Sequence, residues 1–213
     1  MIELFISSLV TLFVVIDPPG CAPIFAGLTA SASAAHRRAM AVRAVTVAAL
    51  ILIVFALFGE ALLHALGISL ESFKIAGGIM LFLIALEMVF EKRTERREDR
   101  AEKVKASEAP DISIFPMAMP MIAGPGSIAS VMLLMSQNDG LERSAAVLGA
   151  MVAILALTLV ALLAAGPIMR LVGAKIEAVI SRLLGVLLGA LATQFVIDGI
   201  RASLVAAPVV TGH

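Results

Sequence analysis

The 213-residue chain is 61% apolar and only 15% charged, and its mean hydropathy of +1.05 excludes a soluble globular domain. The net charge is zero, so no overall basic field favours nucleic acid as a partner. A single cysteine, Cys21, excludes an internal disulfide and a cysteine-based metal site. We therefore expect an integral membrane protein that has the lipid bilayer as its partner and that carries no cofactor or metal.

Six apolar stretches, each close to the ~20 residues that cross a bilayer, follow one another along the chain. They cover residues 2–29, 42–66, 72–90, 112–136, 145–169 and 180–205. The hydrophilic segment 91–111 separates the third from the fourth, and its mixed charges favour a solvated linker or a short exposed helix. The sequence thus predicts an all-α polytopic membrane protein, divided into residues 1–90, a cytoplasmic linker 91–111, residues 112–205 and a tail 206–213.

The distribution of basic residues predicts the orientation of the chain in the membrane. All but three of the 16 Lys and Arg residues lie at the loops that follow the first, third and fifth stretches. The exceptions are Lys74, Arg143 and Arg201. Because cytoplasmic loops carry the excess of Lys and Arg, we expect those three loops in the cytoplasm and both termini on the other side of the inner (plasma) membrane.

Proline and glycine interrupt the first and the fourth stretches. Residues 14–25 read VVIDPPGCAPIF, and residues 120–132 read PMIAGPGSIASVM. Proline removes an amide donor and frees carbonyls of the preceding turn, whereas glycine lets the backbone bend or approach a ligand. Both interruptions fall near the middle of a span, where freed backbone groups are tolerated only if they are buried in protein or line a cavity.

The two interruptions occupy matching places in the two halves of the chain. Pro19 lies in register with Pro125, and after a one-residue slip Glu87 matches Gln194. Because each half holds three spans, the second half must enter the membrane from the opposite side. We therefore predict two inverted three-helix repeats with the first and fourth helices broken at mid-membrane, a pattern typical of secondary transporters. Chance similarity between apolar segments is the alternative.

A half-helix begins at each break, and its free N–H groups carry partial positive charge that suits a carboxylate. The carbonyl ends of the preceding half-helices suit an ammonium group or a small cation. No Arg or Lys lies within the broken spans to hold a second carboxylate, so a small neutral amino acid is the zwitterion that fits best. The residues expected to bind it are Asp17, Gly20, Cys21 and Ala22 at the first break and Gly124, Gly126 and Ser127 at the second.

The alternative is that the breaks are structural kinks, with Asp17 as an N-cap and Pro18 at the first helical position. An ionisable residue at this depth is nevertheless a functional candidate, and Asp17, Glu87 and Gln194 are candidates for coupling transport to H⁺ or Na⁺. Glu87 is alternatively an interfacial residue, and Gln194 a donor to a neighbouring helix. The GVLLG motif at 185–189 predicts close helix packing.

The chain contains the motifs DPPGCAPIF and IAGPGSIASV, and through them it resembles the MarC family of membrane proteins across residues 1–205. The resemblance implies a six-helix protein that transports small neutral amino acids such as glycine and alanine. This chain departs from many members, which have Asn at the position of Cys21 and often at that of Asp17. The resemblance also implies substrate contacts at Asp17, Gly20, Gly124, Gly126 and the neighbouring backbone.

Two other functions stay open, namely export of another small solute or drug, and a membrane protein without transport activity. A membrane-embedded enzyme is not expected, because the chain contains no HExxH and no GxSxG with a partner histidine. We therefore assign no catalytic residue. The direction of transport, the coupling ion and the oligomeric state are not predicted.

Overall fold

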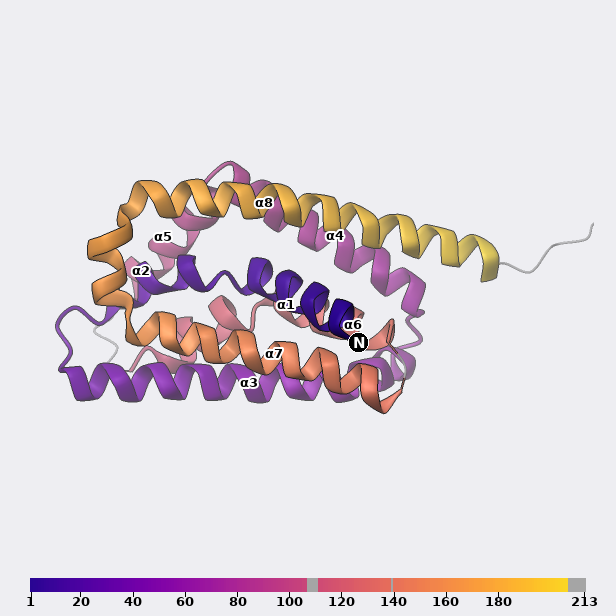
Figure 1. Ribbon diagram of the computed structural model, residues 1–213, viewed down its shortest axis with the longest axis horizontal. Coiled ribbons are helices and arrows are strands. Elements are labelled where there is room, and N and C mark those ends of the chain that lie inside the picture. Colours follow the sequence, from indigo (N-terminus) through magenta and orange to yellow (C-terminus); the bar gives the residue numbers. More distant parts are fainter. Residues whose placement is uncertain (107–110, 139, 207–213) are drawn as a thin grey trace, which may run out of the picture.

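The structure is a computed structural model that describes residues 1–106, 111–138 and 140–206. Every regular element in these ranges is helical, and Figure 1 shows the helices arranged as an elongated bundle. The predicted tail 206–213 lies outside the described residues except for its first position. In chain order the elements are α1 (Ile2–Ile16), α2 (Pro18–Leu28), α3 (Ala34–Ala65), α4 (Leu70–Val89), α5 (Lys92–Ala106), η1 (Ser113–Ile122), α6 (Pro125–Ser136), α7 (Leu141–Leu163) and α8 (Ala165–Ala206).

Most ends of the observed spans lie within several residues of the ends that the hydropathy pattern predicts. Among the described residues, five helices are long and apolar enough to cross a membrane, and the total rises to six when η1 and α6 count as one bent span. Large apolar side chains such as Leu50, Phe58, Leu83 and Leu187 are more than half exposed, as expected for surfaces that face lipid rather than water. The prediction of an all-α polytopic membrane protein is confirmed.

Short polar residues set the starts of two long helices. The Ser33 side chain accepts a hydrogen bond from the His36 amide at the start of α3, and the Ser69 side chain accepts one from the Ser72 amide at the start of α4. Such N-caps satisfy amides that have no partner within the helix. Gly67 precedes the second cap with a φ of +69°, and the chain reverses there between two antiparallel spans.

Helices α4 and α8 lie side by side over much of their length (Figure 1). A Cβ added at Gly185 would lie 2.8 Å from the Met88 Cβ, and one added at Gly78 would lie 2.8 Å from the Ala192 carbonyl oxygen. Side chains at these positions would hold the two backbones apart, so glycine is what lets the helices touch. The prediction that the 185–189 motif serves helix packing is confirmed.

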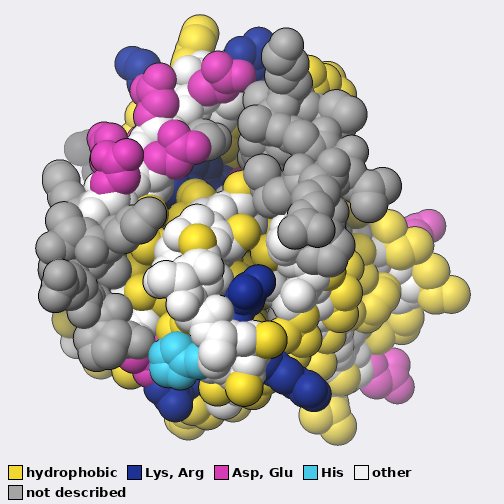
Figure 2. Space-filling model, turned by 90° about the vertical axis from the view of Figure 1, so that its left-hand side faces the viewer, with side chains coloured by type: hydrophobic (Ala, Val, Ile, Leu, Met, Phe, Trp, Pro, Cys, Tyr) yellow, Lys and Arg dark blue, Asp and Glu magenta, His cyan; other side chains and the backbone are white. Residues whose placement is uncertain are grey.

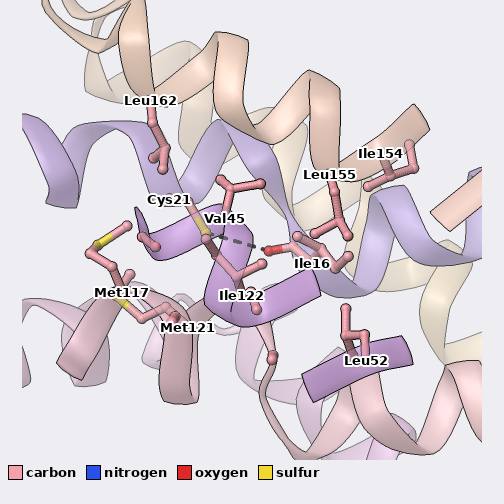
Figure 3. Packing of buried hydrophobic residues seen from close by; sticks show 14 of the residues in the cluster. Ile16, Cys21, Val45, Leu52, Met117, Met121, Ile122, Ile154, Leu155 and Leu162 are labelled. Atoms are coloured by element: carbon pink, nitrogen blue, oxygen red, sulfur yellow. Dashed lines mark hydrogen bonds between the residues drawn. The ribbon is translucent and has the colours of Figure 1, made fainter. Parts of the chain in front are cut away.

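The buried core surrounds the interrupted spans. Figure 3 shows Ile16 and Cys21 of the first break packed with Ile122 of the second, and with Leu52 of α3 and Leu155 of α7. Helix α1 contacts α6 and α7, whereas α3 contacts η1, α6 and α7. Figure 1 shows the N-terminal end of α1 close to α6, so the two broken spans run in opposite directions through the bundle.

Helix α5 and the loop between α2 and α3 lie at the end of the bundle that Figure 2 faces. Acidic side chains form a row along one edge of this end. The acidic residues of α5 are all exposed, and they are Glu95, Glu98, Asp99 and Glu102. The other face of α5 is turned toward α2, α4 and η1, so this helix has a solvent side and a protein side.

Candidate functional site at the two helix breaks

The first break is a single residue, Asp17, which has a left-handed φ of +58° and ends α1 while capping α2. Its carboxylate accepts a hydrogen bond from the Gly20 amide at 3.1 Å, and its own amide donates to the Phe13 carbonyl at 2.9 Å. Asp is one of the few residues other than glycine that tolerate this conformation. The capping role of Asp17, with Pro18 at the first helical position, is therefore confirmed.

The second break bends the chain by 52° between η1 and α6. Gly124 precedes α6 with extended backbone angles, and Pro125 takes the first helical position. A Cβ added at Gly124 would lie 2.4 Å from the Pro120 carbonyl oxygen. The bend therefore requires glycine at position 124, because a backbone atom cannot move aside as a flexible side chain can.

Matching side chains hydrogen-bond to matching carbonyls at the two breaks. The Cys21 thiol donates to the Ile16 carbonyl at 3.5 Å, and the Ser127 hydroxyl donates to the Ile122 carbonyl at 2.7 Å. In both cases the donor lies five positions after the acceptor, and all four residues are buried. These carbonyls were expected to be available to a substrate ammonium, but one lone pair of each is already used.

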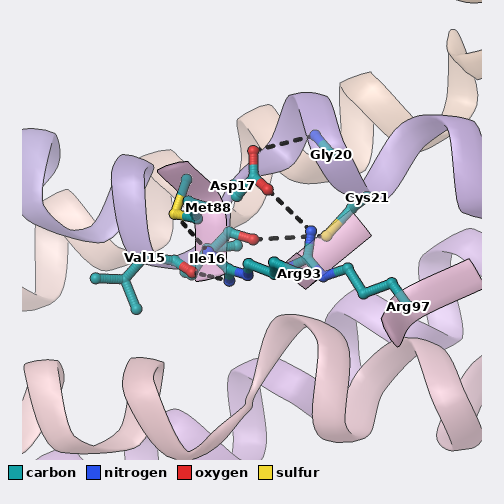
Figure 4. A network of polar contacts seen from close by, with 8 residues as sticks. All are labelled: Val15, Ile16, Asp17, Gly20, Cys21, Met88, Arg93 and Arg97. Carbon is teal, nitrogen blue, oxygen red and sulfur yellow. Dashed lines mark hydrogen bonds and ion pairs between the residues drawn. The ribbon is translucent and has the colours of Figure 1, made fainter. Parts of the chain in front are cut away.

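Two arginines of α5 reach the first break, as Figure 4 shows. The Arg97 guanidinium forms an ion pair with the Asp17 carboxylate at 2.9 Å, and the two side chains are only 8% and 4% exposed. The Arg93 guanidinium donates to the Val15 carbonyl at 2.7 Å. The short helix, one of the two alternatives for the charged segment, is present, but it is not wholly exposed: α5 packs against α2 and brings two basic groups to a break whose own spans contain none.

The sequence of α5 contains a signal for this arrangement. Arg93, Arg97 and Ala101 recur every four residues and thus share one helix face, whereas the four acidic residues lie on the exposed side. Burial, followed by the nearby charge of Arg97, lowers the pKa of Arg93 to about 10, which leaves its guanidinium protonated at neutral pH. The amphipathic pattern of the linker indicates both arginines as buried residues, but not their partners, Asp17 for Arg97 and the Val15 carbonyl for Arg93.

A cavity of about 330 Å³ lies between the second break, α4 and α5. The predicted site residues Gly124, Gly126 and Ser127 line it, whereas Asp17, Gly20, Cys21 and Ala22 are buried and are not among its lining residues. A Cβ added at Gly126 would lie 3.3 Å from a methyl carbon of Val15, so the two breaks approach each other there. The other lining residues are Val15, Met80, Leu83, Ile84, Glu87, Arg93, Arg96, Arg97, Pro120, Met121 and Pro125.

The two matched polar residues of the third and sixth spans occupy different environments. Glu87 lines the cavity and forms an ion pair with Arg96. Gln194 is exposed on α8 and donates a hydrogen bond to Asp198, one turn along the same helix, at 2.9 Å. The prediction of a hydrogen bond from Gln194 to a neighbouring helix is therefore wrong, and Gln194 is not among the residues that line the cavity.

Comparison with known proteins finds a family of membrane proteins that matches nearly the whole chain. The model of a family described as MarC family integral membrane protein matches residues 2–204. The chain is 37% identical to the UPF0056 membrane protein of Methanocaldococcus jannaschii, over 95% of this chain and 98% of that one. It is 36% identical to the UPF0056 inner membrane protein YhgN of Escherichia coli, over 92% and 95% respectively. No solved structure matches the chain.

Proposed function

Because the chain belongs to the MarC family of integral membrane proteins, we propose that it is a secondary transporter of small neutral amino acids in the inner membrane. The observation that carries the proposal is the meeting of two broken spans beside a cavity of about 330 Å³ that also holds charged side chains. Broken helices at mid-membrane form the binding sites of many secondary transporters. A relative whose name places it in the inner membrane supports the location.

The helix neighbours support an inverted repeat. Exchanging the two halves would replace the broken span α1–α2 by η1–α6, α3 by α7, and α4 by α8. This exchange turns the contact of α1 with α7 into the contact of η1 with α3, and that of α2 with α7 into that of α6 with α3, and all four contacts exist. It also maps the contact between α4 and α8 onto itself. The opposite directions of the broken spans and the matching hydrogen bonds of Cys21 and Ser127 are in keeping with this symmetry.

The second break provides the proposed contact for the substrate carboxylate. Gly126 and Ser127 lie in the first turn of α6, where amides have no partner within the helix, and both line the cavity. The positive end of the α6 dipole favours an anion at this point. The Val15 carbonyl and the Asp17 carboxylate at the first break are the proposed contacts for the ammonium group or for a coupling ion, and Val15 lines the same cavity.

A second candidate substrate class, a small organic anion, is favoured by Arg93. Two of the three cavity arginines are neutralised, since Arg97 pairs with Asp17 and Arg96 with Glu87. Arg93 instead donates to the Val15 carbonyl and to the Met88 sulfur. Its charge, added to the α6 dipole, would stabilise a second carboxylate.

Counterflow in proteoliposomes tests both candidates. Liposomes loaded with unlabelled glycine or alanine should accumulate the same radiolabelled amino acid transiently. Gly126→Val should abolish the signal, since its branched side chain would fill the space between Ile84 and Val15. Counterflow of succinate in place of glycine and alanine would select the organic anion, and no counterflow of either class would contradict a transporter of small carboxylate-bearing solutes.

A further inference from the structure

Helix α5 places two positive charges on the groups of the first break that would attract a cation. Arg97 contacts the Asp17 carboxylate, and Arg93 contacts the Val15 carbonyl at the end of α1. These acceptors are the ones that the proposed function needs for a substrate ammonium or a coupling ion. We propose that α5 is a gate over the first break, and that its two guanidinium groups compete with such a cation for these acceptors.

The contacts of α5 with the bundle are those of a helix that can move away from the first break. A second cavity, of about 260 Å³, lies between part of α5 and α2, and its lining includes Gly27 of α2 and Glu98, Ala101 and Glu102 of α5. Among the described side chains of α5, only Arg97 is buried, Arg93 and Ala101 are half-buried and the four acidic ones are exposed, so these side chains pack against the bundle mainly through two arginines. Segments with few buried apolar contacts open at low cost in free energy.

A pivot for this movement lies where α4 passes into α5. Glu91 adopts a φ of +61° between the two helices, and its carboxylate pairs with Arg182 of α8. A single residue outside helical geometry can absorb the change in direction of a moving helix. Movement about Glu91 would carry Arg93 and Arg97 away from the break together.

Competition has a consequence that can be measured. A cation that binds Asp17 only after Arg97 has left binds with an apparent Kd equal to its intrinsic Kd divided by the fraction of time the gate is open. Removing the Arg97 charge should therefore tighten binding. The opposite assignment, in which Arg97 binds the substrate carboxylate directly, requires the same change to weaken binding.

Cys21 is a natural reporter of the gate, because it is the only cysteine in the sequence and is fully buried beside Asp17 and Arg97 (Figure 4). The rate at which N-ethylmaleimide modifies the purified full-length protein in detergent should be low. Arg97→Gln should raise this rate at least tenfold, because α5 loses its ion pair. Glu95→Gln, which removes a charge from the exposed side of the same helix, is the matched control and should leave the rate unchanged.

Arg97→Gln leaves the buried Asp17 carboxylate without its ion-pair partner and could misfold for that reason. A second variant therefore distinguishes opening of α5 from misfolding. Asp17→Asn combined with Arg97→Gln removes both charges while keeping side chains of similar size, and it should also label at least tenfold faster. Size-exclusion chromatography and thermal unfolding identify which variants are folded. Wild-type labelling in the folded variants would overturn the gate.

Calorimetric titration with glycine and with alanine tests whether Arg97 competes with the substrate. We expect a lower Kd for Arg97→Gln than for the wild type, and a higher Kd would overturn the competition by assigning Arg97 to the substrate carboxylate. The gate rests on the proposed function only for the identity of the cation. If neither amino acid binds any variant, the proposed substrate class fails, whereas the labelling of Cys21 still decides whether α5 opens.

Discussion

Asp17 ends one helix, caps the next and neutralises Arg97, and each task uses a different part of the residue. The backbone supplies the left-handed turn, one carboxylate oxygen accepts the Gly20 amide, and the other faces the guanidinium. The close approach explains Gly20, because an added Cβ would lie 2.2 Å from that second oxygen and 2.9 Å from the Arg97 nitrogen. The demand for glycine at position 20 thus comes from an ion pair within the protein.

Two substitutions of Asp17 separate its backbone tasks from its charge. Asp17→Asn and Asp17→Ala both remove the carboxylate, but Asn still caps α2 and tolerates the left-handed conformation. We expect Asp17→Ala to be less stable than Asp17→Asn by about 2 kcal/mol, the sum of about 1 kcal/mol each for the cap and for the left-handed backbone. Unfolding by denaturant in detergent measures the difference, and equal stabilities would contradict the capping role.

The charge of Asp17 is tested by transport rather than by stability. If Asp17 couples transport to an ion gradient, Asp17→Asn should retain counterflow of glycine and alanine but lose accumulation driven by a proton or sodium gradient. This expectation follows because exchange needs the intact site, whereas coupling needs a group that binds the ion. Gradient-driven accumulation at the wild-type level in Asp17→Asn would remove Asp17 from the coupling mechanism.

Glycines at the second break give a test with an internal control. Gly124→Ala should destabilise the protein by at least about 1 kcal/mol, because the new Cβ would collide with the Pro120 carbonyl at 2.4 Å. Gly27→Ala, in α2, has no atom within 4 Å of the added Cβ, and it should stabilise the helix by about 0.5–1 kcal/mol. Thermal unfolding in detergent compares the two, and a destabilised Gly27→Ala would show that α2 is packed more tightly than described.

At the scale of elements, α4 and α8 form the closest helix pair of the described bundle, and glycines on both sides set their separation. The Cβ positions of Gly78 and Gly199 would lie 2.8 Å and 3.0 Å from backbone oxygens of the facing helix. Between two helices in lipid there is little hydrophobic driving force, so association depends on such close packing. The glycine pattern therefore acts on the interface between α4 and α8 and lies apart from the cavity.

The 185–189 motif predicts unequal effects for its two glycines. Gly185→Val should separate α4 from α8 and destabilise the protein by about 1–3 kcal/mol through overpacking, since the Met88 Cβ lies 2.8 Å from the added Cβ. Gly189→Ala meets only Ala85 at the ordinary distance of 3.7 Å and should be nearly silent. Unfolding curves in detergent test this order, and equal losses would mean that the helices pack symmetrically about both positions.

At the scale of the whole molecule, the two ends of the bundle differ in charge. The loop between α2 and α3 and helix α5 share one end with the basic residues predicted to be cytoplasmic, whereas the turn between α6 and α7 lies at the other end (Figure 1). By the positive-inside rule we therefore expect α5, the proposed gate, to face the cytoplasm. Both termini are then expected outside the cytoplasm.

Cysteine accessibility tests this orientation. In a Cys21→Ala background, Ser31→Cys, in the loop between α2 and α3, should be shielded from impermeant thiol reagents in intact cells. Gln137→Cys, at the end of α6, should react. Both wild-type positions are exposed, so burial would not account for a difference. The reverse labelling pattern would overturn the orientation and would place the gate on the outer side.

Much of this fold was determined by the sequence alone, because its causes are local. Apolar runs of bilayer length specify the spans, proline and glycine specify the two breaks, and the GVLLG motif specifies a close helix contact. The cap at Asp17 was also predictable, since it depends on residues three positions apart. Each of these features can be read from neighbouring residues without knowing which helices pack together.

Only the tertiary structure decided how the charged segment meets the first break. Arg97 and Asp17 are 80 positions apart, and no periodicity or composition links an arginine in a polar linker to an aspartate in an apolar span. The cavity is likewise lined by the second break and by Glu87, whereas Gln194 faces outward. Contacts between distant segments depend on how whole helices are placed in space, and that placement minimises the free energy of the entire bundle rather than that of any local stretch.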